Sequence, residues 1–206
     1  MPRHPRIEFW FDFTSIYSYP AAMRVEALAD AHGVAVDWRP FLLGPVFRRI
    51  GWDGPPLFVH RAKGDYAWRD MARRCRLHGL PFQRPPVFPL PSLRPLRIAT
   101  IGADRPWIGG FCRQVMQAGF GEARAIDSDE VLRPILHRLG LDPDAMLAEA
   151  TSDATRAALR ARTDEASERG IFGAPMVFMG REMFWGDDRL EDAMAWATGG
   201  GDADPS

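Results

Sequence analysis

A short, strongly apolar segment near the start of the chain ends at a turn rich in hydroxyl groups. Residues 7–13, IEFWFDF, are mostly aromatic or aliphatic and predict a buried β-strand. Residues 17–32, YSYPAAMRVEALADAH, predict a helix that stops at Gly33, and residues 34–43, VAVDWRPFLL, alternate like a second strand. A helix between two strands at this spacing predicts that the strands are parallel.

The chain then changes character, because helical patterns replace strand patterns. Residues 44–56 are rich in Gly and Pro, and PFQRPPVFPLPSLRP at 81–95 holds six prolines, which predicts a loop or an extended segment. Helices are expected at about 60–79, at 96–119 with an interruption near Gly109 and Gly110, and at 127–140, 142–150 and 153–169.

The last part of the chain returns to strands. PMVFMG at 175–180 predicts a strand, MFW at 183–185 predicts its hairpin partner, and DDRLEDAMAWA at 187–197 predicts a closing helix. Asp188 and Glu191 have the spacing of a capping box at the start of that helix.

The full order of elements is β-α-β, then a long helical block, then β-β-α. This is the order of an α/β thioredoxin fold with an all-helical domain inserted after the second strand. We expect residues 1–43 and 171–200 to form a discontinuous thioredoxin-like domain, and residues 44–170 to form the insertion.

Composition and motifs narrow the classes of function. The chain has 26 basic and 27 acidic residues, so a general nucleic-acid-binding surface is not expected, and the arginines at 48–49 and 73–76 are interpreted as solvated helix faces. Cys75 and Cys112 form no C-x-x-C motif and are expected to be buried apolar residues. No metal-ligand spacing, signal peptide or membrane-length apolar run occurs, so we expect a cytoplasmic protein without metal or membrane.

In a thioredoxin-type fold, the turn between the first strand and the first helix is the reactive centre. The free N–H groups and partial positive charge of the helix start stabilise an anion there, especially a thiolate. Here the turn is Ser15-Ile16-Tyr17-Ser18, so Ser15 stands where a redox member would place its attacking cysteine. The Ser15 hydroxyl can donate a hydrogen bond to a thiolate brought by a ligand. The alternative is that Ser15 only caps the helix.

Two later segments can complete such a site. Ala174-Pro175 enters a strand directly from a loop, and in this fold that proline is usually cis and faces the reactive turn. The backbone of Ala174 can then pair with an extended peptide ligand, unless Pro175 is simply a proline at an ordinary strand start. Asp187 and Asp188 begin another helix beside the sheet, where a carboxylate or an ammonium can bind, although Asp188 is also a natural helix cap.

Three motifs, FDFTSIYSY, FGAPMVF and MFWGDDRLE, resemble those of 2-hydroxychromene-2-carboxylate isomerases. That family belongs with the kappa-class glutathione transferases in the DsbA-like branch of the thioredoxin superfamily. The resemblance extends over about residues 6–198, in the same order and at similar spacing. It implies a homodimeric, glutathione-dependent isomerase. Such an enzyme converts 2-hydroxychromene-2-carboxylate-type acids to the trans ring-opened benzylidenepyruvate in aromatic hydrocarbon degradation.

The resemblance also implies roles for individual residues. Ser15 would be the catalytic residue that hydrogen-bonds the sulfur of reduced glutathione. Ala174, next to Pro175, would pair through its backbone with the cysteinyl unit. Asp187 and Asp188 would hold the γ-glutamyl end.

The same resemblance implies roles for three further positions. Lys63 would reach the glycyl carboxylate of glutathione, with Arg61 as a rival, and Asp53 stands where relatives place a polar residue near the ligand. No single arginine is preferred as the partner of the substrate carboxylate; the candidates are Arg39, Arg48 and Arg84.

The chain departs from the family pattern at two positions. Ile16 replaces a common proline in the turn, and Asp187 replaces a common Asn or Ser, where it either repels the γ-glutamyl carboxylate or favours the ammonium. The alternatives are a kappa-like glutathione transferase or peroxidase acting on other electrophiles, and a non-catalytic glutathione-binding protein. The missing C-x-x-C motif excludes a thiol–disulfide oxidoreductase.

Overall fold

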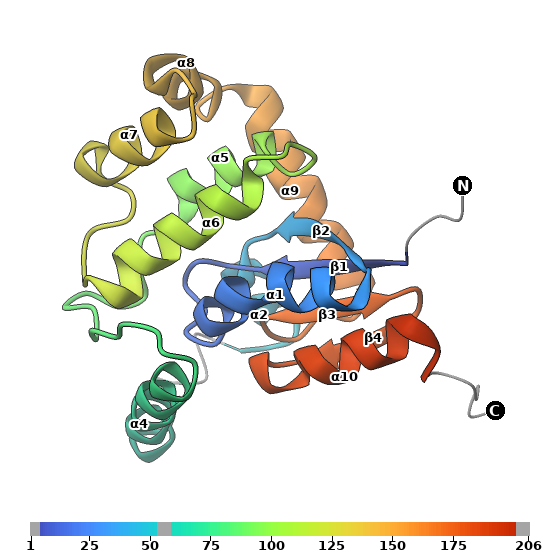
Figure 1. Cartoon of the computed structure of the whole chain (residues 1–206). Coiled ribbons are helices and arrows are strands. Elements are labelled where there is room, and N and C mark those ends of the chain that lie inside the picture. The colour runs from blue at the N-terminus through green and yellow to red at the C-terminus, as the bar shows by residue number, and fades with distance from the viewer. Residues whose placement is uncertain (1–4, 53–58, 201–206) are drawn as a thin grey trace.

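The computed structural model describes residues 5–52 and 59–200 and is built on one mixed sheet (Figure 1). The strand order is β2-β1-β3-β4, with bounds β1 (Arg6–Phe11), β2 (Ala35–Pro40), β3 (Met176–Met179) and β4 (Glu182–Trp185). β1 and β2 are parallel, with Phe9 opposite Trp38, and β3 is antiparallel to β1 and to β4. The expected thioredoxin fold is confirmed, and the parallel pair follows from the helix that joins its two strands.

The helices of the described residues mostly have the predicted positions. Their bounds are α1 (Ser18–His32), α2 (Leu43–Arg49), α4 (Arg61–Leu77), α5 (Leu93–Ile101), α6 (Ile108–Met116), α7 (Asp129–Arg138), α8 (Pro143–Glu149), α9 (Asp153–Glu168) and α10 (Leu190–Ala195). Ser128, Asp142 and Ser152 cap α7, α8 and α9 with their side chains. Within the described ranges, no helix is both long and apolar enough to cross a membrane.

Alternating residues of β1 build the two faces of the sheet. Ile7, Phe9 and Phe11 are fully buried in the larger core, on the face that α1 and α10 cover together (Figure 1). Trp10 is buried in a second core, on the opposite face, with residues of α2 and the end of α9. The strand therefore has no solvated face, which explains its continuous aromatic sequence.

α2 begins just before the stretch rich in Gly and Pro and extends into it, because Pro45 lies in the first turn, where a missing N–H is tolerated. One expectation about the middle of the chain is wrong. Gly109 and Gly110 do not interrupt a helix but lie inside α6, and the break falls at residues 102–107. A side chain at Gly109 would collide with the carboxyl group of Glu26 on α1, so this glycine leaves room for that group.

The predicted capping box at the end of the chain is also wrong. A short 3-10 turn, Asp187–Arg189, precedes α10, and neither element has a side-chain cap. Glu191 forms an ion pair with Arg24 of α1 instead.

The cysteine prediction is confirmed, since Cys75 and Cys112 are buried and unpaired with each other. Burial raises the pKa of Cys75 to about 11 and also raises the pKa of Cys112, so both are poor nucleophiles. The division of the chain into a thioredoxin-like domain and an insertion at 44–170 stays a prediction.

Candidate functional site

The reactive turn and the strand that starts at the proline meet through one short hydrogen bond. The Ser15 hydroxyl donates to the backbone carbonyl of Ala174 at 2.7 Å, and each residue is only 8% exposed. The Ala174–Pro175 peptide bond is cis, as the sequence predicts. The Ser15 oxygen also accepts the backbone N–H of Ser18 at 3.3 Å, so Ser15 supports the start of α1 as well.

A buried carboxylate that the sequence analysis did not single out fixes this turn. The Asp12 side chain accepts the backbone N–H of Thr14 at 2.9 Å and that of Leu43 at 2.8 Å, and it also bonds the Ser92 hydroxyl. Its backbone carbonyl accepts the N–H of Ser15 at 3.0 Å. Burial raises the pKa of Asp12, against the opposing effect of these donors. Asp12 thus ties the turn to the starts of α2 and α5.

The Asp187 segment lies directly beside the cis-proline. The N–H of Gly186 donates to the carbonyl of Pro175 at 3.1 Å, and Gly186 has φ of +118°, which favours glycine. The Asp187 side chain is 4% exposed, and its Oδ2 accepts Nε of Arg74 at 2.8 Å and Nη2 at 2.7 Å. Burial raises the pKa of Asp187, and Arg74 opposes that rise. The prediction of a solvated helix face is therefore wrong for Arg74, which is half-buried and forms an ion pair with the buried Asp187.

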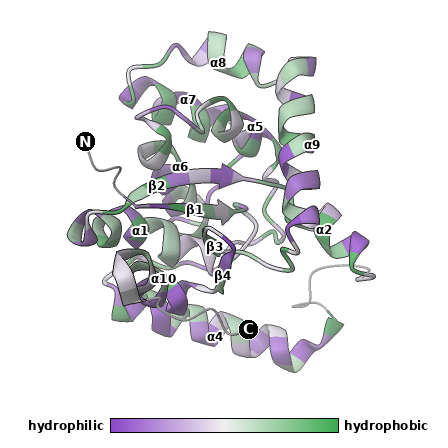
Figure 2. Cartoon of the chain, turned by 90° about the vertical axis from the view of Figure 1, so that its right-hand side faces the viewer, coloured by the Kyte–Doolittle hydropathy of each residue, from purple (hydrophilic) through white to green (hydrophobic). Residues whose placement is uncertain are grey.

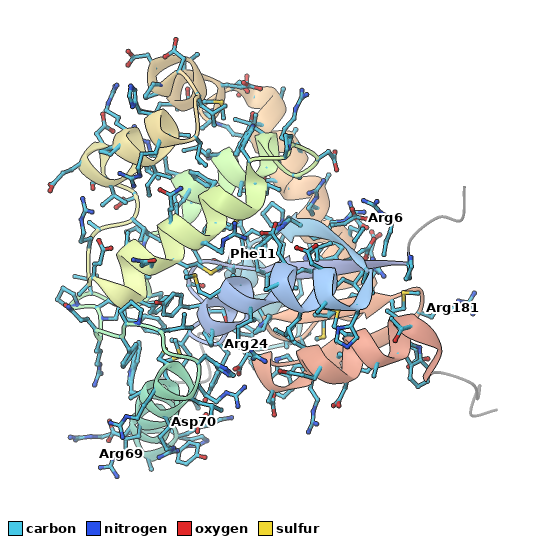
Figure 3. All side chains as sticks on the ribbon, in the orientation of Figure 1. Arg6, Phe11, Arg24, Arg69, Asp70 and Arg181 are labelled. Carbon is cyan, nitrogen blue, oxygen red and sulfur yellow. The ribbon has the colours of Figure 1, made fainter. Side chains whose placement is uncertain are left out.

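Helix α4, which carries Arg74, also contacts the reactive turn itself. The Tyr17 hydroxyl donates to Asp70 at 3.0 Å, and burial together with this carboxylate raises the pKa of Tyr17. The ribbon of α4 alternates between hydrophilic and hydrophobic residues (Figure 2), and its buried side includes Ala67, Met71 and Cys75, four residues apart. Figure 3 shows Asp70 on α4 and Arg24 on α1; the latter donates to the Asp187 carbonyl at 3.2 Å.

Other predicted ligand residues do not join this cluster. Lys63 is exposed on α4 and makes no hydrogen bond or ion pair within the described residues, and Arg61 is exposed on the same helix. Asp188 is exposed beside the buried Asp187. Asp53 lies outside the described residues.

The three arginines considered for a substrate carboxylate have different surroundings. Arg39 pairs with Glu8 at 3.1 Å, and Arg48 is exposed on α2. Arg84 is exposed, and its guanidinium lies 4.9 Å from the ring centre of Trp68. None of them contacts Ser15 or Ala174 in the described part of the chain.

Comparison with known proteins identifies the family of this chain. A family model described as a DSBA-like thioredoxin domain matches residues 6–195. The chain belongs to the DsbA-like thioredoxin family. Within that family, it is 32% identical to a 2-hydroxychromene-2-carboxylate isomerase of Pseudomonas putida over 186 residues, which cover 89% of this chain and 90% of the relative.

A solved structure and a more distant relative extend the comparison. A solved structure of a 2-hydroxychromene-2-carboxylate isomerase superposes with a TM-score of 0.84 at 31% identity, covering 92% of this chain and 94% of that one. Glutathione S-transferase kappa 1 of Caenorhabditis elegans is 25% identical over 207 residues, covering 92% of this chain and 89% of the relative. The resemblance drawn from the three motifs is therefore confirmed.

The close approach of Trp185 to Gly173 gives a testable prediction for the segment before the cis-proline. A methyl group at Gly173 would lie 2.5 Å from Nε1 of Trp185, whose ring packs edge-on against Phe172. We expect Gly173→Ala to displace the indole and lower the free energy of unfolding by about 1 kcal/mol. Tryptophan fluorescence and urea denaturation measure both effects. Gly44→Ala is the control, because its methyl group meets only Arg48, at 3.8 Å.

Proposed function

We propose that this protein is a glutathione-dependent isomerase of 2-hydroxychromene-2-carboxylate-type acids, forming the trans ring-opened product in the degradation of aromatic compounds. The observation that carries the proposal is the 2.7 Å contact between the Ser15 hydroxyl and the Ala174 carbonyl, in a chain whose 31–32% identical relatives bear that isomerase name. The contact brings a donor for a thiolate next to a backbone acceptor for a peptide.

The residues around the cis-proline fit the cysteinyl unit of reduced glutathione. When the Ala174 carbonyl accepts a peptide N–H from the ligand, it no longer needs the Ser15 hydroxyl as its donor. Ser15 can then rotate and donate to the sulfur, while its oxygen keeps the Ser18 N–H within reach. Ser15 is thus the proposed catalytic residue, and the cost of freeing it is offset by the new bond at Ala174.

The Arg74–Asp187 pair fits the γ-glutamyl end, which carries one carboxylate and one ammonium. Nε and Nη2 of Arg74 both bond Oδ2 of Asp187. The other carboxylate oxygen, Oδ1, is therefore left as an acceptor for an ammonium. The sequence alone left open whether Asp187 repels the carboxylate of the ligand. The positive charge of Arg74 offsets that repulsion. Asp188, Lys63 and Asp53 stay proposed ligand residues on the strength of the family motif alone.

Glutathione, when bound, supplies a thiolate nucleophile toward the conjugated acid. A hydrogen bond from Ser15 to that anion stabilises it by about 1.5–3 kcal/mol, which lowers the pKa of a bound thiol from about 8.5 to about 7. The start of α1 adds to the same effect. The protein can therefore hold most of a bound thiol ready for reaction near neutral pH.

The first test is a glutathione titration at neutral pH, followed by thiolate absorbance in the far ultraviolet. We expect saturable thiolate formation in the wild type, and a loss of about tenfold or more in Ser15→Ala, because the anion loses its hydroxyl donor. Ser18→Ala is the matched control, since the buried Ser18 hydroxyl has no partner among the described residues. An unchanged thiolate signal in Ser15→Ala, or no saturable signal in the wild type, would refute the proposed role.

A glutathione transferase is the second candidate, favoured by the 25% identity to two proteins named kappa glutathione transferases. The same glutathione site would serve both reactions. Product analysis with 2-hydroxychromene-2-carboxylate and with 1-chloro-2,4-dinitrobenzene separates them, because only the first reaction regenerates free glutathione. If both reactions fail while thiolate still forms, the protein only binds glutathione. A homodimer and a cytoplasmic location stay predictions.

A further inference from the structure

A cavity of about 460 Å³ lies beside the anchor of the reactive turn. Most of its wall comes from Leu42, from residues 91–94 at the start of α5, and from Ala150 and Thr151 after α8, with Arg97 and Asp127 completing it. Ser92, in this wall, bonds the Asp12 carboxylate that holds the turn of Ser15. The volume lies in the range of small-molecule sites.

The cavity is a partly open depression lined by both exposed and buried residues. Pro91, Leu93 and Thr151 are exposed and form its rim, while Ser92 and Ala150 are buried at its base. The wall is mainly apolar, with charged groups at a few positions, which is the pattern of a site for an amphipathic ligand.

Arg97 is the charged residue of this wall that lacks a partner. Its Nε is fully buried without a hydrogen bond, and its side chain forms no ion pair in residues 5–52 or 59–200. Arg94, by contrast, pairs with Asp129 at 2.6 Å and donates to the Asp127 carbonyl at 2.9 Å. Arg97 as a whole is only partly buried, so an incoming carboxylate can reach its guanidinium and pair its charge through a charge-assisted hydrogen bond.

We propose that the cavity walled by Leu42, Ser92 and Arg97 binds an aromatic carboxylate, with Arg97 holding the carboxylate group. Leu42, Leu93 and Ala150 supply the apolar surface for the ring. The choice of an aromatic acid as ligand rests on the proposed function, whereas the cavity and its unpartnered cation do not. Asp127 also lines the wall and opposes the anion, whereas Arg97, unlike Arg94, has no carboxylate partner of its own among the described residues.

The test measures binding of 2-naphthoate to the full chain in the absence of glutathione, by ligand-observed NMR or calorimetry. We expect saturable binding to the wild type, at least about tenfold weaker in Arg97→Met, because a charge-assisted hydrogen bond is lost. Asp127→Asn should tighten binding, since it removes the opposing charge. The neutral analogue 2-naphthamide should bind the wild type and Arg97→Met equally.

Two further variants complete the test. Thr151→Trp is designed to fill the cavity from its exposed rim while Arg97 is kept, and it should abolish naphthoate binding. It therefore tests the cavity independently if Arg97→Met does not fold. Arg181→Met, in the β3–β4 turn (Figure 3), removes an exposed arginine elsewhere and should leave binding unchanged. Absence of naphthoate binding, or binding that ignores both Arg97→Met and Thr151→Trp, would overturn the proposal.

The outcome is separable from that of the proposed function. If Ser15→Ala loses the thiolate but keeps naphthoate binding, both proposals stand. If the wild type forms no thiolate yet binds naphthoate through Arg97, the cavity is an aromatic-acid site and the isomerase proposal fails.

Discussion

Replacing Arg74 by methionine should lower the free energy of unfolding by about 3 kcal/mol. The substitution keeps most of the length of the side chain but leaves the Asp187 carboxylate without its ion-pair partner. That side chain is 4% exposed and accepts two hydrogen bonds from Arg74. A charge left unpaired in a buried position costs more than a surface ion pair contributes. Urea denaturation at neutral pH measures the loss.

Two variants test this explanation for Arg74. Arg73→Met, one residue earlier on α4, removes an exposed arginine whose ion pair with Asp70 is also partly exposed, so it should lower stability much less than Arg74→Met does. Adding Asp187→Leu to Arg74→Met should restore much of the stability, because it removes the stranded charge. A double variant no more stable than Arg74→Met would show that packing, rather than the charge, sets the cost.

Asp12→Ala should lower the free energy of unfolding by about 2–4 kcal/mol and impair thiolate formation as well. The change leaves the backbone N–H groups of Thr14 and Leu43 buried without acceptors, and each such group costs about 1–3 kcal/mol. The turn that positions Ser15 loses its anchor to α2 at the same time. Asp30→Ala, an exposed change on α1, is the control and should alter stability by less than about 0.5 kcal/mol.

The raised pKa of Asp12 gives this result a pH dependence. Because burial lifts the folded pKa above the ordinary value of 3.8, the ionised form is less favourable in the folded state than in the unfolded state. The contribution of Asp12 to stability is therefore greatest below pH 3.8 and declines as the pH rises through the folded pKa. The stability advantage of the wild type over Asp12→Asn should narrow from about pH 4 upward. A constant difference would contradict the raised pKa.

Most of the fold could be predicted because its elements have strong local signals. The aromatic run of β1, the glycine after α1 and the Asp142-Pro143 start of α8 each fix an element within one or two residues. The hydroxyl turn and the Ala174-Pro175 step could be found for the same reason. Their contact spans 159 residues, and it could be expected only because the order of elements predicts which ends of the sheet meet.

The residues that were missed act through distant partners. Arg74 and Asp187 are 113 residues apart, and nothing local distinguishes Arg74 from its exposed neighbours Arg73 and Arg76. Asp12 had a usable signal in the sequence, because an aspartate at the end of an apolar strand is typical of an Asx turn. In such a turn the side chain accepts the N–H two residues later, as Asp12 does from Thr14. The prediction at Gly109 is wrong because a glycine that leaves room for a neighbouring side chain looks the same in sequence as one that ends a helix.

The bond between the Ser15 hydroxyl and the Ala174 carbonyl also sets which thiols the proposed site can select. When the Ser15 hydroxyl turns toward a sulfur, the Ala174 carbonyl loses its hydrogen-bond donor. A ligand replaces that donor only if it carries a peptide N–H beside its thiol. A simple alkyl thiol has no such group, so it would leave a buried acceptor empty and bind poorly. At the proposed site, the resting hydrogen bond would therefore favour thiols embedded in a peptide over small thiols that carry no peptide N–H.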